Sequence, residues 1–413
     1  MRKSLVIAAT TVLTCTWAIL PAAAAASAAP AAPAAPAASV APGSVVPDQD
    51  PFYAAPANIA DLTPGQVVAG RRVPGVNLFG IPVPVDAWQV SYRTSDSHGA
   101  PELAVTTLVV PKAAWTGHGP RPVVSLQTPE DSVGTQCAPS YQIATGTDVQ
   151  DAALGAQLLL AGWAVALPDF EGPKSVFLAG PQAGHAVLDG IRAVRSFGTD
   201  GVGATNPWAL DGYSGGAEAT AWAAQLQPSY APDVRLVGAA MGGTPSDPAA
   251  VARYIDGGPF AGFEFAASYG VAAEFPEAGI NGLLNSNGQR DFAALKGQCE
   301  ASILLGFAFK RLANDTVPSN PLAVPSVAAV LKADTLGAAA PSTPVYDYHA
   351  DTDEIVPVGQ DNTMVRAWCG RGATVQEARD LLGEHVEEVA ARAVSVELFL
   401  AARFAGARPS SSC

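Results

Sequence analysis

The sequence predicts an α/β fold with a mostly parallel central sheet, helices on both faces of the sheet and an inserted helical cap. Three observations favour this fold. Strand-like apolar runs alternate with helical patterns from about residue 121 to 245. A stretch at about 246–340, rich in aromatic residues, interrupts the alternation, which resumes near residue 343. Alternating strands and helices are typical of βαβ units, in which the strands lie parallel.

The composition limits the possible partners. The chain has 413 residues, of which 49% are hydrophobic and 15% charged, and its formal net charge is −14. This apolar content is sufficient for a large core. Because phosphate contacts need an excess of Lys and Arg, we expect no nucleic-acid partner. We also expect a monomer without an integral membrane segment in the mature chain.

The N-terminus has the pattern of a secretory signal peptide. Two basic residues precede an apolar run at 5–20, which Pro21 ends, and Ala-Ser-Ala follows at 26–28. We expect a signal peptide over residues 1–28, cleaved near Ala26 or Ala28, and a secreted mature protein. An uncleaved anchor is disfavoured because the apolar run is short and contains threonines.

An Ala- and Pro-rich segment at 29–50 follows. Such a composition cannot bury enough surface to fold, so we expect a linker. The catalytic domain is then expected to span residues 51–413.

The elements of the domain are predicted in chain order. Residues 52–75 look irregular, and the alternating segments 85–95 and 102–111 indicate an antiparallel strand pair. A strand at 121–126 is followed by a long loop, QTPEDSVGTQCAPS. Further elements are a helix at 148–161, a strand in WAVALP, a helix at 184–197, strands at 208–210 and 234–240, a strand at 343–349 and helices at 361–369 and 387–405. The aromatic residues of 246–340 either line a pocket for an apolar substrate or pack the core of the cap.

Residues 210–225, LDGYSGGAEATAWAAQ, carry the clearest chemical signal. They combine the end of a strand, a Gly-x-Ser-x-Gly turn and an Ala-rich helix, which is the context of a nucleophile elbow. In such an elbow Ser214 stands clear of the sheet, and the helix N-terminus faces any oxyanion formed on it. The alternative, a plain strand-to-helix turn, is disfavoured by the flanking elements.

A serine nucleophile needs a histidine as base and a carboxylate that orients the histidine. In hydrolases of this fold the order along the chain is serine, then the acid, then the histidine. Of the five histidines, only His349 and His385 follow Ser214. We predict His385 as the base because it comes after the acidic loop and before the last helix. His185 is interpreted as a buried or helix-capping residue, and His98 and His118 as solvated loop residues.

The acidic loop ADTDEIVP offers three carboxylates. We predict Asp353 as the acid because an apolar Ile-Val-Pro segment follows it closely. Asp351 is the second choice, and Glu354 is interpreted as part of a solvated loop.

Four cysteines remain after signal cleavage, namely Cys137, Cys299, Cys369 and Cys413. An even number in an exported chain indicates two disulfides, with three possible pairings. No His or Cys spacing is typical of a metal site, and we expect no metal or cofactor.

Four segments in this order resemble the secretory lipase family, the lipase A-like triacylglycerol lipases: QCAPSYQ at 136–142, GYSGGAEA at 212–219, YHADTDEIVP at 348–357 and GEHVEE at 383–388. The resemblance implies an α/β-hydrolase fold, a helical cap and hydrolysis of long-chain acyl esters. It also implies the bridges Cys137–Cys299 and Cys369–Cys413.

An oxyanion hole needs two donors. We predict the backbone of Gly215 as one of them. The loop after the strand at 121–126 has Glu130-Asp131 where many hydrolases have His-Gly. This pair is similar to that of the lipase A-like enzymes, which points to Asp131 as the second donor.

The sequence therefore predicts a secreted serine hydrolase that cleaves carboxylic esters, acting on a lipid ester or at a lipid–water interface. Three alternatives remain open: a short-chain esterase, a secreted serine peptidase or amidase of the same fold, and a non-catalytic binding protein.

Overall fold

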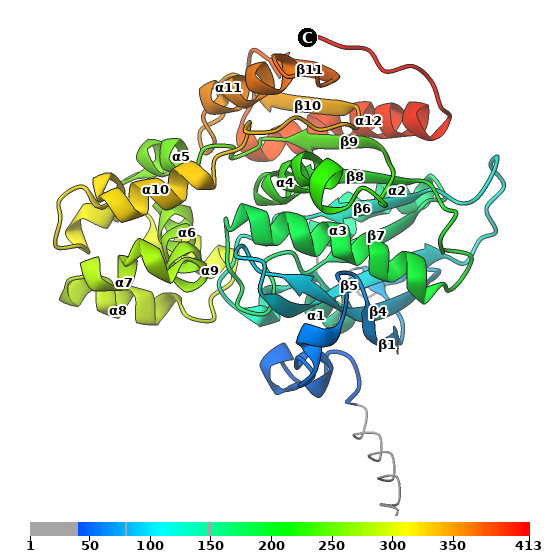
Figure 1. Cartoon of the computed structure of the whole chain (residues 1–413), viewed down its shortest axis with the longest axis horizontal. Helices are drawn as coiled ribbons and strands as arrows, with labels where there is room; N and C mark the ends of the chain where they lie inside the picture. The colour runs from blue at the N-terminus through cyan, green and yellow to red at the C-terminus, as the bar shows by residue number, and fades with distance from the viewer. Residues whose placement is uncertain (1–39, 79–80, 148–149) are drawn as a thin grey trace, which may run out of the picture. The chain divides into compact units, whose positions relative to one another are not determined.

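The computed structural model describes residues 40–78, 81–147 and 150–413 (Figure 1). The predicted signal peptide at 1–28 and the first part of the predicted linker, 29–39, lie outside the described residues. Residues Val40–Cys413 form one compact unit.

Within the described residues, the centre of this unit is a nine-stranded sheet with the strand order β1-β4-β5-β7-β6-β8-β9-β10-β11. The six strands from β7 to β11 in this order run parallel, and β1, β4 and β5 form an antiparallel edge. The strands are β1 (Val67–Val73), β4 (Val85–Ser95), β5 (Pro101–Pro111), β6 (Val123–Gln127), β7 (Ala164–Pro168), β8 (Trp208–Tyr213), β9 (Leu236–Gly242), β10 (Val345–Ala350) and β11 (Val375–Asp380). A separate hairpin pairs β2 (Asn77–Leu78) with β3 (Ile81–Pro82).

Helices cover both faces of the sheet, as Figure 1 shows. One face packs against α3 (Gly180–Phe197), α4 (Gly215–Tyr230) and α11 (Val358–Cys369). The other packs against α1 (Pro139–Thr145), α2 (Gln150–Leu160) and α12 (His385–Phe404). Helices α3 and α4 lie very close together at Gly184. A Cβ at this position would lie only 3.0 Å from the backbone of Trp222. The central strands β6, β7 and β8 are buried along their whole length, as expected for a covered parallel sheet.

The predicted cap is helical in the described chain. Its helices are α5 (Pro248–Ile255), α6 (Ala261–Glu274), α7 (Ile280–Leu283), α8 (Ser286–Leu295), α9 (Glu300–Phe307) and α10 (Pro325–Ala333). They share one apolar core with residues of the loops that follow β6, β7 and β10, including Val133, Phe177 and Ile355. Because chemistry in such sheets lies at the carboxyl ends of the strands, this core places the cap beside the candidate site.

The packed unit starts earlier than residue 51. Residues 40–50 already contact it: Arg71 donates to the Val40 carbonyl at 3.1 Å and forms an ion pair of 2.6 Å with the buried Asp50. The part of the predicted linker within 40–50 is therefore packed onto the domain. A buried ion pair and a short 3-10 helix, Pro47–Gln49, hold it despite its composition.

Four of the described strands were not predicted as strands, namely β1, β2, β3 and β11. The region 52–75, expected to be irregular, contains β1, which pairs with β4 at the antiparallel edge. Strand β11 lies at the opposite edge and reads VQEARD, with mostly polar residues that are only partly buried. Edge strands carry little hydrophobic pattern because one of their sides faces no neighbour, and this hides them in a sequence.

The C-terminal tail is attached to the edge of the sheet. Cys413 forms a disulfide with Cys369 at the end of α11. The Ser412 amide donates to the Val375 carbonyl of β11 at 2.7 Å. The tail therefore covers part of an edge strand that would otherwise be exposed.

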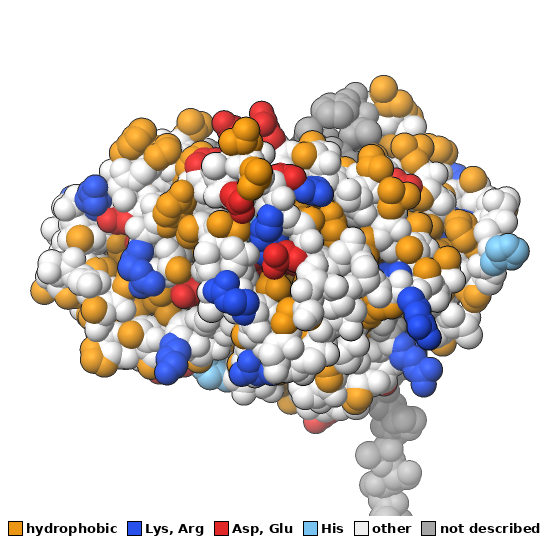
Figure 2. Space-filling view, turned by 90° about the horizontal axis from the view of Figure 1, so that it is seen from above, with side chains coloured by type: hydrophobic (Ala, Val, Ile, Leu, Met, Phe, Trp, Pro, Cys, Tyr) orange, Lys and Arg blue, Asp and Glu red, His pale blue; other side chains and the backbone are white. Residues whose placement is uncertain are grey.

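Among the described residues, none of the helices has the length and apolar character needed to cross a membrane. On the face in Figure 2, basic side chains lie scattered among apolar and acidic ones.

Candidate active site

Ser214 occupies a strained turn between β8 and α4. Its backbone angles are φ 54° and ψ −125°, a conformation that L-residues rarely adopt. A Cβ on Gly212 would lie 2.4 Å from the Gly216 carbonyl oxygen, and one on Gly216 would lie 2.0 Å from the Gln127 carbonyl oxygen. Glycine is therefore required on both sides of the serine, as a nucleophile elbow demands.

The structure brings together the three residues that the sequence singled out. His385 Nε2 lies 2.8 Å from Ser214 Oγ, and His385 Nδ1 lies 2.6 Å from Asp353 Oδ2. All three residues are buried. The result is a continuous hydrogen-bonded chain from a hydroxyl through an imidazole to a carboxylate.

The loop after β10 explains why Asp353 and not Asp351 faces the histidine. Asp353 Oδ1 accepts the amides of Ile355 at 2.9 Å and Val356 at 2.7 Å. Those two apolar side chains are buried in the core of the cap, so the loop folds back and points Asp353 inward. Asp351 is exposed.

His349 was not assigned to the site from the sequence, but the structure places it beside Asp353. Its Nε2 lies 3.2 Å from Asp353 Oδ2 and 2.8 Å from the Val356 carbonyl oxygen. Its Nδ1 lies 3.3 Å from Asp361 Oδ2, and Asp361 pairs with Arg379 at 2.9 Å. This buried network of charged groups holds Asp353 in place on the His349 side.

The pKa values follow from this network. Burial alone would lower the pKa of His349, but hydrogen bonds to Asp353 and Asp361 outweigh burial and raise it to about 10. Burial alone would raise the pKa of Asp353, but hydrogen bonds from His349 and His385 outweigh it and hold the pKa well below its usual value. Asp353 is therefore a carboxylate at neutral pH.

His385 is held by its backbone as well as by its ring. It is the first residue of α12, and its amide donates to Glu354 Oε2 at 3.0 Å. Its carbonyl accepts the Tyr213 hydroxyl. Glu354, interpreted from the sequence as part of a solvated loop, therefore positions the histidine.

Asp131 lies against Gly215, the first residue of α4. A Cβ on Gly215 would lie 2.0 Å from Asp131 Oδ1, so only glycine allows this approach. Asp131 is buried with φ 43°, and its Oδ1 has no hydrogen-bond partner among the described residues. Burial raises the pKa of Asp131 well above its usual value, and the carboxyls of Glu300 and Glu171 raise it further. This direction favours the protonated form of the carboxyl group. Asp131, Ser214 and Gly215 line the same small cavity.

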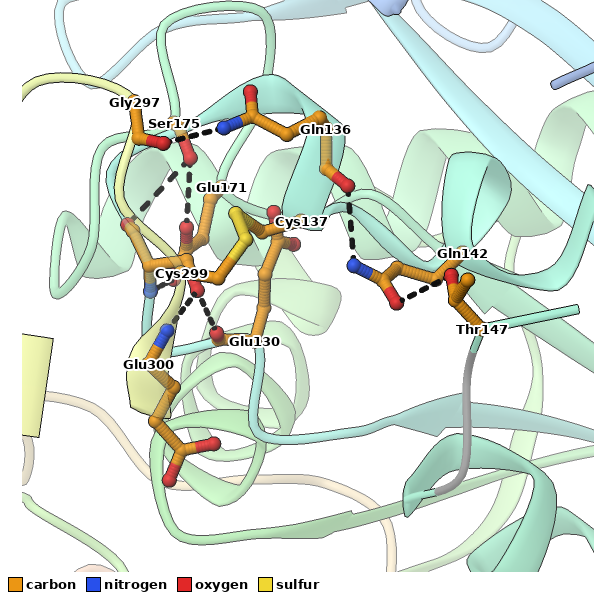
Figure 3. The surroundings of a disulfide bond; sticks show 11 residues. Glu130, Gln136, Cys137, Gln142, Thr147, Glu171, Ser175, Gly297, Cys299 and Glu300 are labelled. Atoms are coloured by element: carbon orange, nitrogen blue, oxygen red, sulfur yellow. Dashed lines mark hydrogen bonds between the residues drawn. A yellow bond between two sulfur atoms is a disulfide. The ribbon is translucent and has the colours of Figure 1, made fainter. Parts of the chain in front are cut away.

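A disulfide connects the loop that carries Asp131 to the cap (Figure 3). Cys137 in this loop is bonded to Cys299 just before α9. Around the bridge, the Val133 amide donates to the Gln298 carbonyl at 3.0 Å, and the Glu300 amide donates to Ser132 Oγ at 3.1 Å. The structure thus joins the two cysteine pairs that the family resemblance implies.

A small cavity extends from Ser214 into the cap. Its volume is about 30 Å³, and its lining includes Phe177, Ile255, Phe263 and Ile355. This volume holds water but no acyl chain, so the described conformation is closed. A larger apolar cavity, about 310 Å³, lies away from Ser214 among β5, β7 and α2.

The remaining histidines lie outside the site. His185 is partly buried, stacks on Tyr230 at 4.1 Å and contacts the Asp96 carbonyl oxygen at 3.2 Å. His118 is exposed, and the exposed His98 contacts Glu277 at 2.9 Å.

In the described part of the chain, one group of side chains has the proximity of metal ligands: Asp96, His98 and Glu274. Its oxygens already accept backbone amides, since Asp96 Oδ1 accepts His98 at 2.9 Å and Glu274 Oε1 accepts Ser97 at 2.7 Å. These bonds give the group a loop-closing role.

The fold and the site geometry define an α/β-hydrolase, and comparisons with known proteins narrow the class. The family model described as secretory lipase matches residues 139–412. Lipase A of Moesziomyces aphidis is 34% identical over 390 residues, which cover 89% of this chain and 82% of that protein. The chain belongs to the secretory lipase family.

Two further similarities bear on structure and activity. The X-ray structure of Candida antarctica lipase A in its closed state superposes with a TM-score of 0.82 at 32% identity, covering 91% of this chain and 89% of that one. A Mycobacterium tuberculosis protein named probable inactive lipase is 33% identical over 372 residues, covering 88% of this chain and 83% of that protein. Activity must therefore be argued from the residues of each chain.

Proposed function

We propose that this protein is a secreted triacylglycerol lipase that cleaves carboxylic esters through Ser214, His385 and Asp353. The observation that carries the proposal is the hydrogen-bonded chain with contacts of 2.8 Å and 2.6 Å. An inactive member of the family would have no need to hold a strained serine against a buried histidine and carboxylate.

The proposed reaction has two halves. His385 removes the proton of Ser214 as Oγ attacks the ester carbonyl carbon, and Asp353 stabilises the imidazolium that forms. The tetrahedral intermediate collapses, the alcohol leaves with the proton from His385, and an acyl-serine remains. Water then attacks the acyl-serine with His385 as base, which releases the fatty acid and restores Ser214.

The oxyanion is proposed to be held by the Gly215 amide at the N-terminus of α4 and by Asp131. The α4 dipole favours negative charge at this position. A neutral Asp131 adds no repulsion, whereas an ionised one would oppose the developing charge. Preorganised donors of this kind typically supply about 10²–10³ in rate each.

The apolar lining of the cavity supports a lipid as substrate, because ester chemistry alone does not require Phe263, Ile255 and Ile355 beside the serine. The names of the related lipases point the same way. Since the cavity is closed, binding of an acyl chain is proposed to move helices of the cap.

Most of the side chains in the same lining are apolar, which favours a lipid ester over a peptide as the substrate. The other ester-cleaving candidate is a short-chain esterase, which differs from a lipase in the length of the acyl chain that it prefers. We further propose that the mature chain is a monomer, released by cleavage near Ala26 or Ala28.

The test is a substrate panel assayed with the purified protein. We expect hydrolysis of long-chain triacylglycerols and of nitrophenyl palmitate, and no cleavage of peptide anilides. Activity on butyrate esters alone would favour a short-chain esterase. Activity on amides alone would refute the proposed function.

A further inference from the structure

The cavity beside Ser214 contains one polar side chain that the proposed mechanism does not use. Apart from Ser214 and Asp131, the polar member of its described lining is Glu264, in the first turn of α6. Glu264 is 3% exposed, and its neighbours in the lining include Phe263 and Ala267. A carboxyl group among apolar side chains needs a reason, because burial without partners is costly.

The carboxyl group of Asp256, which follows α5, is close enough to Glu264 to raise its pKa further, after the larger effect of burial. Asp256 in turn accepts Arg311 Nη1 at 3.2 Å and the Leu312 amide at 3.1 Å. These two donors hold Asp256 as the charged member of the pair.

Two neighbouring carboxyl groups repel one another unless one of them is protonated. Since Asp256 already accepts two donors, the proton belongs to Glu264. Burial raises the pKa of Glu264 to about 9, and the charge of Asp256 contributes to the rise. When this proton points at Asp256, the second oxygen can only accept a hydrogen bond. That oxygen, Oε2, is buried and has no partner among the described residues.

We propose that Glu264 is a specificity-determining residue: its Oε2 accepts a hydrogen bond from a hydroxyl group on the acyl chain, so hydroxylated acyl esters are preferred substrates. This inference rests on the proposed ester hydrolysis at Ser214. It concerns which acyl chain fits and not which bond is cleaved.

The energetic argument compares two chains in the cavity. The volume of about 30 Å³ can hold water, which can donate to Oε2 in the free protein. An unsubstituted chain displaces that water and leaves Oε2 unsatisfied, whereas a hydroxylated chain replaces the hydrogen bond. A buried acceptor left without a partner typically corresponds to about a tenfold loss in kcat/KM.

The experiment measures kcat/KM for paired nitrophenyl esters of acids from four to twelve carbons. One member of each pair carries a terminal hydroxyl group and the other does not. The chain length scans the distance between Ser214 and Glu264. At one or two adjacent lengths, we expect the hydroxylated ester to be preferred about tenfold over its partner.

Two variants assign the preference to Glu264. Glu264→Gln places an amide donor toward Asp256 and a carbonyl oxygen toward the cavity, so the preference should persist. Glu264→Leu removes the acceptor, so the ratio should fall to about one, mainly because the unsubstituted ester improves. Thermal unfolding of both variants reports whether they are folded.

A wild-type ratio near one at every length would overturn the inference, and this result needs no variant. A preference that survives Glu264→Leu would overturn it as well. If the wild-type protein hydrolyses neither member of any pair, the proposed function is refuted, and the inference with it.

Discussion

His349 Nε2 lies 3.2 Å from Asp353 Oδ2, the same oxygen that contacts His385 Nδ1 at 2.6 Å. One carboxylate oxygen therefore contacts two histidines, which differ in their surroundings. His385 faces the serine, whereas His349 is fully buried between Asp353 and Asp361. The buried histidine holds the carboxylate in place, and in the proposed mechanism His385 exchanges a proton with Ser214.

The first prediction concerns stability and pH. The pKa of His349 is raised from 6.5 to about 10 in the folded protein. Its contribution to stability is therefore fully present below about pH 6.5 and is lost as the pH rises through about 10. We expect His349→Gln to lower the free energy of unfolding by about 3 kcal/mol near pH 6, because it leaves buried carboxylates unpaired. The difference from wild type should shrink towards pH 10. Denaturant unfolding at several pH values measures it.

His118→Gln is the matched control, because His118 is exposed and should show no such pH dependence. A destabilisation by His349→Gln that is constant from pH 6 to pH 10 would contradict the assignment of a charged His349.

The second prediction separates the two acids of the loop after β10. Asp353→Asn removes the carboxylate that orients the His385 ring, and we expect kcat to fall by about 10³–10⁴. Asp351→Asn changes an exposed side chain and should leave kcat within about twofold. Steady-state kinetics on a nitrophenyl ester measures both. Equal losses in the two variants would remove Asp353 from its role.

The third prediction concerns the contact between Gly215 and Asp131. A Cβ at position 215 would lie 2.0 Å from Asp131 Oδ1, so Gly215→Ala must displace the Asp131 side chain. If both residues hold the oxyanion, we expect kcat to fall by about 10²–10³. KM should change much less, because the contact acts on the transition state.

Gly306→Ala in α9 is the control for this substitution. A Cβ there meets nothing within 4 Å, so activity should be unchanged and the helix slightly stabilised. A Gly215→Ala enzyme with full activity would exclude this oxyanion site.

The fourth prediction compares the two disulfides. The sequence separations are 162 for Cys137–Cys299 and 44 for Cys369–Cys413. In the chain-entropy model, removal of the bridges costs at most about 5 and about 4 kcal/mol, respectively. Only the first bridge connects the Asp131 loop to the cap. Replacing both of its cysteines by serine should therefore lower kcat, whereas the same change at the second bridge should affect only thermal stability. An equal effect of both on kcat would contradict this.

Local patterns made the turn at Ser214 predictable, and the chain order of Ser214, Asp353 and His385 pointed to the residues that the structure brings into contact. Gly212, Ser214 and Gly216 are adjacent in sequence because the tight turn itself requires them, so the signal is contained in a few residues. The alternation of strands and helices likewise reflects local burial, and it led to the correct fold class. Boundaries shifted by a few residues: α3 starts at Gly180 and not at 184, and β9 ends at Gly242 and not at 240.

Other features depend on contacts between distant segments. His349 looked like an ordinary strand residue because its partners, Asp353 and Asp361, meet it only after β10 and α11 pack. Glu264 was not singled out in the sequence, because only the folded chain places it beside Phe263 in the lining of the cavity. The edge strand β1 contains Gly70 and two arginines, so its pattern does not reveal pairing with β4.

The central claim is that Ser214 is a nucleophile activated by His385. The most direct test is reaction of the purified protein with a fluorophosphonate, followed by mass spectrometry of the digested protein. We expect one label per chain, on Ser214, with loss of ester hydrolysis in proportion to labelling and almost no reaction in His385→Ala. Labelling of another serine, or full ester hydrolysis by a Ser214→Ala variant, would contradict the claim.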